Sequence, residues 1–111
     1  MIATLTFAAL VGRWICSSPD EPRNRFLYTF ASNGRGSLAY ASSSGVAEKP
    51  IERFTYRVAN GYVLKDSPGK YPVRDRIVIR GSTLEDRGYD YRRDGMWVPP
   101  PDQNTYVCRR P

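Results

Sequence analysis

The sequence predicts an all-β fold: an antiparallel up-and-down meander of about eight short strands, closed as a small barrel, with a short N-terminal helix. Three observations indicate this class. Short stretches of alternating apolar and polar residues recur along the chain. Turn-forming Gly, Pro, Asn and Ser residues separate them. Only one short stretch, near the N-terminus, has a pattern typical of a helix.

The chain is expected to form one domain, residues 1–111, because its 111 residues are near the usual size of a single domain. A hydrophobic content of 41% and a charged content of 25% are typical of a globular protein. Closure is favoured because a barrel leaves no exposed sheet edge.

The first element is expected to be a helix over residues 3–11, with Thr4 or Thr6 as its N-cap. Gly12 would end this helix. Residues 13–18 then alternate as the first strand.

Two hairpins are expected next. Residues 25–31 and 37–41 alternate on either side of the turn-rich stretch 32–36. Residues 53–66 are expected to form the second hairpin, because Asn60-Gly61 supplies two residues that tolerate positive φ, as a type I′ turn requires. Between the hairpins, the apolar-poor stretch 42–50 is expected to be a mobile loop.

The C-terminal half continues the meander less regularly. Strands are predicted over residues 73–80 and 83–87. The alternation then fails between Gly88 and Asp102, where residues 89–92 are expected to form one irregular strand. Residues 105–110 are predicted to be the closing strand.

Closure would bring the first strand beside the last, so Cys16 and Cys108 could be neighbours. A disulfide between them would stabilise the fold by roughly 3–5 kcal/mol in an oxidising compartment. The alternative is a pair of reduced, buried cysteines that act as small apolar groups.

Composition excludes several kinds of chemistry. The sequence contains no His, which removes the usual general base near neutral pH and the commonest metal ligand. Two Cys alone cannot complete a zinc site, so no metal and no cofactor are predicted. Asp75, at an apolar-face position, is the best candidate for a perturbed carboxyl group. Glu85 and Asp86 would point to opposite faces of a strand, so they make a poor acid-base pair and no enzyme is predicted.

The net charge of +6 comes mainly from Arg, since only three of the 17 basic residues are Lys. Arg binds carboxylate or phosphate with two parallel donors and stacks on aromatic rings. This bias indicates an anionic or acidic partner. The alternative is that the Arg side chains are the solvated faces of amphipathic strands.

The stretch Leu10-Val11-Gly12-Arg13-Trp14 carries a resemblance to a known family. A short helix followed by Gly-x-Trp at the start of the first strand resembles the opening of lipocalins and the wider calycin group. The resemblance implies that Trp14 plugs one barrel end and that Arg109 or Arg110 covers it. It also implies one of several functions, because lipocalin-like domains bind small apolar ligands, inhibit enzymes or bind other proteins.

The favoured function is a non-enzymatic binding domain that uses rim and loop residues on an acidic protein, for instance as an inhibitor. Large rings are expected to fill the barrel interior and leave binding to the outside. The residues expected to face the interior are Phe26, Tyr28, Phe30, Tyr40, Phe54, Tyr56 and Val58. The binding surface is sought between residues 87 and 97, because Tyr, Trp and Arg dominate protein-protein hot spots. Its candidates are Tyr89, Tyr91, Arg92, Arg93 and Trp97.

Three alternatives remain open at this point. Residues 87–97 could be an irregular loop whose aromatic side chains fold back on the barrel. The barrel could carry a small apolar or anionic ligand, as lipocalins do. The chain could bind single-stranded nucleic acid, although its few Lys, its 11 interspersed carboxylates and the lack of an RNP motif disfavour this.

No membrane partner is predicted, because no apolar run approaches the ~20 residues of a membrane-spanning helix. The apolar stretch Ile2–Val11 lacks the flanking features of a signal peptide. A cytoplasmic location is therefore expected if Met1 is the authentic start, and a periplasmic or secreted one if a signal was trimmed.

Overall fold

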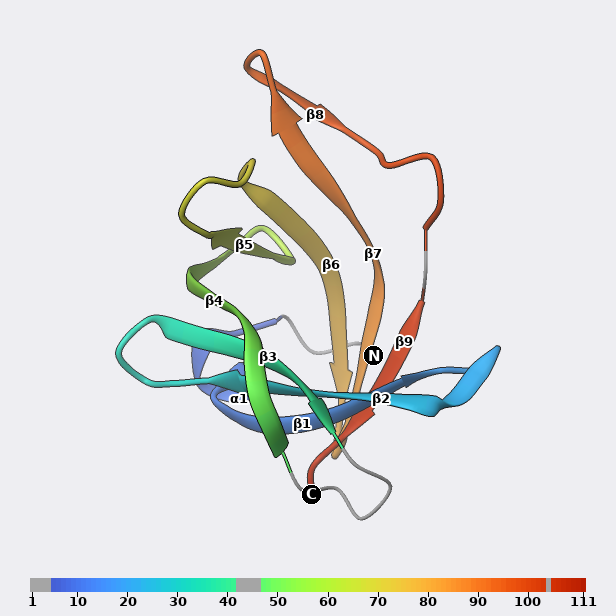
Figure 1. The fold of residues 1–111 in the computed structure, drawn as a ribbon. Helices are drawn as coiled ribbons and strands as arrows, with labels where there is room; N and C mark the ends of the chain where they lie inside the picture. Colours follow the sequence, from blue (N-terminus) through green and yellow to red (C-terminus); the bar gives the residue numbers. More distant parts are fainter. Residues whose placement is uncertain (1–4, 42–46, 104) are drawn as a thin grey trace.

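The computed structural model describes residues 5–41, 47–103 and 105–111. Within these ranges the chain forms one short helix and nine strands (Figure 1). In chain order they are α1 (Phe7–Leu10), β1 (Gly12–Ser18), β2 (Glu21–Phe30), β3 (Arg35–Ala41), β4 (Ala47–Ala59), β5 (Tyr62–Asp66), β6 (Val73–Arg80), β7 (Thr83–Arg93), β8 (Met96–Val98) and β9 (Tyr106–Arg109).

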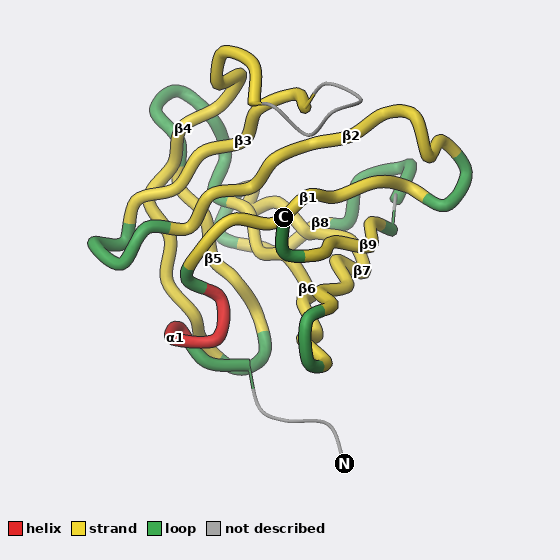
Figure 2. The backbone as a smooth tube through the Cα atoms, turned by 90° about the horizontal axis from the view of Figure 1, so that it is seen from below, coloured by secondary structure: helices red, strands yellow, loops and turns green. Residues whose placement is uncertain are grey.

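Eight of these strands, as far as the structure describes the chain, close into an antiparallel barrel. Strands β1 to β7 pair in sequence order, and β9 then pairs with both β7 and β1. Strand β8 lies outside the closed set, paired with the end of β7 (Figure 1). The view from below in Figure 2 shows the strands curving around a common interior. The predicted closed meander is confirmed.

Strand β7 differs from the expectation of one strand over 83–87 and an irregular one over 89–92. It is a single strand, and its pairing with β6 shifts between Asp75 and Ile77. Gly88, with φ of +114°, provides the backbone conformation at this bulge. The extra residue breaks the alternation, which is why the pattern fails in the sequence. Because of it, Asp86 and Tyr89 both face the barrel interior.

Strand β8 lies in the stretch where the alternation fails and was not predicted. The other differences concern element ends. The helix covers only Phe7–Leu10, and Thr6 is its N-cap, with its hydroxyl accepting a hydrogen bond from the backbone N–H of Ala9 at 3.1 Å. The expectation of a loop over 42–50 is wrong for its last part, because β4 already begins at Ala47. Residues 42–46 and Thr4 lie outside the described residues.

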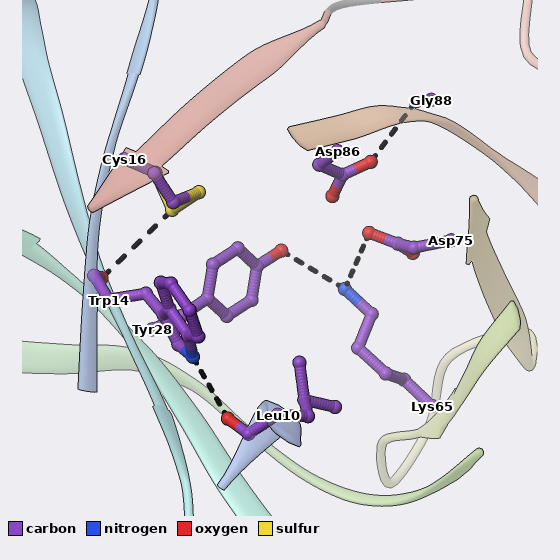
Figure 3. Close-up of a disulfide and its surroundings, with 9 residues drawn as sticks. Leu10, Trp14, Cys16, Tyr28, Lys65, Asp75, Asp86 and Gly88 are labelled. Carbon is purple, nitrogen blue, oxygen red and sulfur yellow. Dashed lines mark hydrogen bonds and ion pairs between the residues drawn. A yellow bond between two sulfur atoms is a disulfide. The ribbon is translucent and has the colours of Figure 1, made fainter. Parts of the chain in front are cut away.

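Trp14 closes one end of the barrel and is 1% exposed. Its indole N–H donates to the carbonyl of Leu10 at 2.9 Å (Figure 3). The Arg110 guanidinium lies 3.8 Å from the centroid of the Trp14 ring and donates to the carbonyls of Val11 and Ala9. The predicted cover over Trp14 is therefore confirmed for Arg110.

The apolar core lies next to this plug. Phe30 packs edge-on against Tyr56, with ring centroids 5.0 Å apart, and both rings contact Phe54. Tyr40 does not join this core, contrary to the expectation. It is 50% exposed and packs against Phe26, because both lie near the opposite barrel end, where the sheet meets solvent.

Candidate ligand cavity in the barrel

A cavity of about 240 Å³ occupies the barrel interior beyond the core. Each of the eight barrel strands contributes at least one side chain to it. The lining residues are Cys16, Phe26, Tyr28, Leu38, Glu52, Lys65, Asp75, Asp86, Tyr89 and Tyr106. Large rings therefore do not fill the whole interior, contrary to the expectation, and the cavity lies between a buried charged cluster and apolar walls.

The centre of the charged cluster is Lys65 on β5 (Figure 3). Its ammonium lies 3.3 Å from Asp75 Oδ2 and donates to the hydroxyl oxygen of Tyr28 at 3.1 Å. The side chains of Lys65 and Asp75 are 12% and 5% exposed. Burial alone would lower the pKa of Lys65, but Asp75, Tyr28 and Asp86 together more than offset this and the pKa is raised. Lys65 therefore keeps its charge inside the barrel.

Aromatic rings complete the surroundings of this ammonium. It lies 5.1 Å from the ring centroid of Tyr28 and 5.4 Å from that of Phe54, within the range of cation–π attraction. Burial raises the pKa of Tyr28, so its hydroxyl stays neutral and can accept the hydrogen bond from Lys65. The rings of Tyr28 and Phe30 stack with centroids 5.3 Å apart, which joins the cluster to the core.

Asp86 on β7 is the second buried acid, and it faces Asp75 and Lys65 in Figure 3. Its Oδ1 accepts a hydrogen bond from the backbone N–H of Gly88 at 3.1 Å, across the bulge. Burial raises the pKa of Asp86 well above its ordinary value, and the charge and hydrogen bond of Asp75 raise it further. Asp86 therefore holds a proton at pH values where an exposed aspartate has lost it.

Asp75 has one unused acceptor. Its Oδ2 pairs with Lys65, but its Oδ1 is buried and has no hydrogen-bond partner among the described residues. This oxygen is enclosed by the protein itself, so it identifies no ligand on its own. The Asp75 carboxylate, the proton-holding Asp86 and the Lys65 ammonium form the charged cluster of the cavity lining.

A pH titration of stability tests the assignment of Asp86. An unfolded aspartate has a pKa near ~3.9, and the pKa of Asp86 is higher in the folded protein, so the native state binds more protons above that pH. Stability should be fully present below about pH 4 and should decline as pH rises through the folded pKa, with a slope of up to about 1.4 kcal/mol per pH unit.

Asp86→Asn should remove this decline, as measured by urea unfolding between pH 4 and 8. A decline in stability that persists in the variant would contradict the assignment.

Asp90 affects stability in a different pH range. Partial burial would raise the pKa of Asp90, but hydrogen bonds from Arg74 and Arg76 lower it, so its contribution is lost only as pH falls below about 4.

The five residues predicted as a binding surface divide between two faces of β7 and β8. Alternation along β7 puts Tyr89, Tyr91 and Arg93 on one face and Arg92 on the other. Tyr89 lines the cavity and is 38% exposed. The Tyr91 ring lies 5.9 Å from that of Tyr71. Arg93 is exposed at the end of the strand.

The other face carries Arg92 and Trp97, which are cross-strand partners. The Arg92 guanidinium lies 5.4 Å from the Trp97 ring. Arg74 lies between the rings of Tyr62 and Trp97, at 4.5 and 4.7 Å, and its Nε donates to Asp90 at 2.9 Å. This face is thus an ordered stack of rings and guanidinium groups.

The segment after β8 folds back along β7. The side chain of Gln103 accepts a hydrogen bond from the backbone N–H of Tyr89 and donates one to its carbonyl. It also accepts from Arg76 at 3.1 Å. These bonds fix the proline-rich connection to the barrel wall and hold Tyr89 at the cavity.

Sequence reasoning placed Asp75 inside the barrel but missed its partners. Lys65 follows the buried Val63 by two residues, and Asp86 follows the buried Leu84 by two. Asp75 was identified because it is a polar residue at an apolar-face position. The same signal is present at Lys65 and at Asp86. Tyr28 was expected in the interior, but as a filler and not as a hydrogen-bond partner.

Comparison of the chain with protein-family models finds no match, and comparisons with curated proteins and with solved structures find none either. Among the described residues, no group of three or more Cys, Asp or Glu side chains is placed to hold a metal ion. No helix in the described ranges has the length and apolar character needed to cross a bilayer.

Proposed function

We propose that this chain is a non-enzymatic, lipocalin-like binding domain that holds a small ligand in the barrel cavity. The observation that carries the proposal is the cavity itself, in which the buried charged cluster of Lys65, Asp75 and Asp86 lies beside apolar walls. Such a combination is typical of ligand sites, where a few polar groups orient a ligand held mainly by apolar contact. The Gly12-Arg13-Trp14 opening and the Arg110 cover support the comparison with lipocalins.

The size of the cavity limits the ligand. About 240 Å³ lies below the ~300–1,000 Å³ typical of pockets for drug-sized ligands. The ligand is therefore a small molecule whose polar end meets Lys65, Asp75 and Asp86 and whose apolar body packs on Phe26 and Leu38. The disulfide between Cys16 and Cys108 supports a periplasmic or secreted location, because disulfides persist mainly in oxidising compartments.

Native mass spectrometry of protein purified from its own host tests this function. A small organic adduct is expected on the wild type. Leu38→Trp fills the cavity and should abolish the adduct, whereas Thr55→Trp, at an exposed position on β4, should retain it. Absence of any adduct, or equal retention in both variants, would count against the proposal. Conversion of the released molecule by fresh protein would contradict the non-enzymatic assignment.

A second candidate is an acidic protein partner on the face of Arg92 and Trp97. It is favoured by the ordered stack of Arg74, Trp97 and Arg92, and by Met96 next to it, which is 69% exposed. A photo-crosslinker at position 96 should then capture an acidic protein in the host, while one at position 55 should not. Capture of oligonucleotides with a steep salt dependence would instead favour nucleic-acid binding.

A further inference from the structure

We propose that the ligand is a small organic cation, an amine with an aromatic or aliphatic body, whose ammonium group is held by Asp75 and Asp86. The inference rests on the proposed function and specifies the chemistry of the ligand. It follows from the number of charges around the cavity, from the neighbouring carboxyl groups of Asp75 and Asp86 and from the rings in the walls.

The charges in the cavity do not balance. Lys65 is the single cation among the lining residues, and it faces two acids, Asp75 on β6 and Asp86 on β7. Glu52 on β4 also lines the cavity, but it has its own partners, Ser67 at 2.9 Å and Lys70 at 3.8 Å. The remaining titratable groups that line the cavity are phenols, from Tyr28 on β2, Tyr89 on β7 and Tyr106 on β9. If both aspartates are ionised, the cluster lacks one positive charge.

The two acids show where that charge would be placed. Asp86, on the neighbouring strand, faces Asp75 (Figure 3). In the empty cavity the proton of Asp86 is shared with Asp75 in a hydrogen bond, and Lys65 pairs with Asp75 Oδ2 and the Tyr28 hydroxyl. A ligand ammonium that takes the place of this proton would donate to both carboxylates.

An anionic ligand is not favoured. A carboxylate or phosphate would meet two acids and one ammonium, two of whose three N–H donors are already directed to Tyr28 and Asp75. Burial of such an unpaired anion is costly. The walls, in contrast, suit an amine with a ring, because Phe26 and Tyr106 both line the cavity and lie edge to face with centroids 5.7 Å apart.

A cationic ligand should exchange with a proton. Burial and the neighbouring Asp75 raise the pKa of Asp86, so the empty cavity neutralises its excess of acid with a proton on Asp86. A bound ammonium favours the ionised form of that carboxyl group, and the proton then leaves to the buffer. Binding of the cation should therefore release protons, whereas binding of a neutral molecule should not.

Isothermal titration calorimetry with three probes of similar size tests the inference: 2-phenylethylamine, 2-phenylethanol and phenylacetate. The amine is expected to bind at least about tenfold more tightly than the other two. Its apparent binding enthalpy should change with the ionisation enthalpy of the buffer, which reports the released proton. That buffer dependence should vanish in Asp86→Asn, and the affinity for the amine should fall about tenfold while the affinity for the alcohol changes little.

The variant Asp86→Asn is expected to fold because it imitates the protonated form that the empty protein already contains. Asp75→Asn, which removes the partner of Lys65, should also weaken amine binding by at least about tenfold. Equal or tighter binding of phenylacetate, no binding of the amine at millimolar concentration, or an amine affinity unchanged in Asp86→Asn would overturn the inference. A small neutral or anionic adduct in native mass spectrometry would overturn it while leaving the proposed function intact.

Discussion

Lys65→Met is expected to lower the free energy of unfolding by about 3–5 kcal/mol at pH 7. The substitution keeps most of the side-chain volume but removes the ammonium group that pairs with Asp75 at 3.3 Å. Asp75, whose side chain is 5% exposed, would then be buried beside Asp86 with no cation in contact. Urea unfolding followed by tryptophan fluorescence measures the loss.

The double variant Lys65→Met/Asp75→Asn separates a charge effect from a packing effect. If the loss arises from an unpaired acid, neutralising Asp75 should restore most of the stability, because removal of both partners of a buried pair costs far less than removal of one. Lys70→Met is the matched control, since Lys70 is 59% exposed and its ion pair with Glu52 spans 3.8 Å. It should change stability by less than about 0.5 kcal/mol. If the double variant is as unstable as Lys65→Met, the loss of stability arises from the packing of the Lys65 stem and not from its charge.

The closed barrel was predictable because residues near the two ends of the chain form two matching pairs. Trp14 and Cys16 lie two residues apart on one face of β1, and Cys108 and Arg110 lie two apart at the other end of the chain. Any closure that places Cys16 opposite Cys108 also brings Arg110 towards Trp14, so two independent pairs favour the same register. The bulge at Gly88 had no such second signal. A single glycine in a strand pattern suggests a bulge but does not identify it.

The cavity was less predictable because it depends on contacts between distant strands. Alternation places Lys65 on the inner face, but a lone Lys is normally assigned to solvent, since its long stem lets the ammonium reach water. Its hydrogen-bond partners inside the barrel, Asp75 and Tyr28, lie 10 and 37 positions from Lys65 in the sequence. Tyr89 required the bulge as well, because Asp86 and Tyr89 are three residues apart and a regular strand would turn them to opposite faces.

Removal of the disulfide is the second change with a large expected effect. Cys16 on β1 and Cys108 on β9 are direct register partners, and the bond between them joins positions 92 residues apart. A cross-link over a loop of this length restricts the unfolded chain strongly, and its loss should lower the free energy of unfolding by about 4 kcal/mol. Oxidised and reduced wild-type protein, compared by urea unfolding with and without a reductant, measure this difference directly.

Reduction leaves both sulfur atoms in the core, so this comparison isolates the cross-link from the packing. Cys16→Ala/Cys108→Ala should be less stable than the reduced protein, because it also removes buried volume where both residues are at most 1% exposed.

Ligand binding in the cavity gives a second measurement, since Cys16 lines the cavity and β9 contributes Tyr106 to its wall. If β1–β9 pairing depends on the bond, the reduced protein should bind the small ligand more weakly, and Asp86→Asn should no longer alter its stability between pH 4 and 8. Equal unfolding midpoints with and without the reductant would contradict a stabilising role of the disulfide. In that case the barrel would be held closed by the pairing of its strands and by the contact of Arg110 with Trp14.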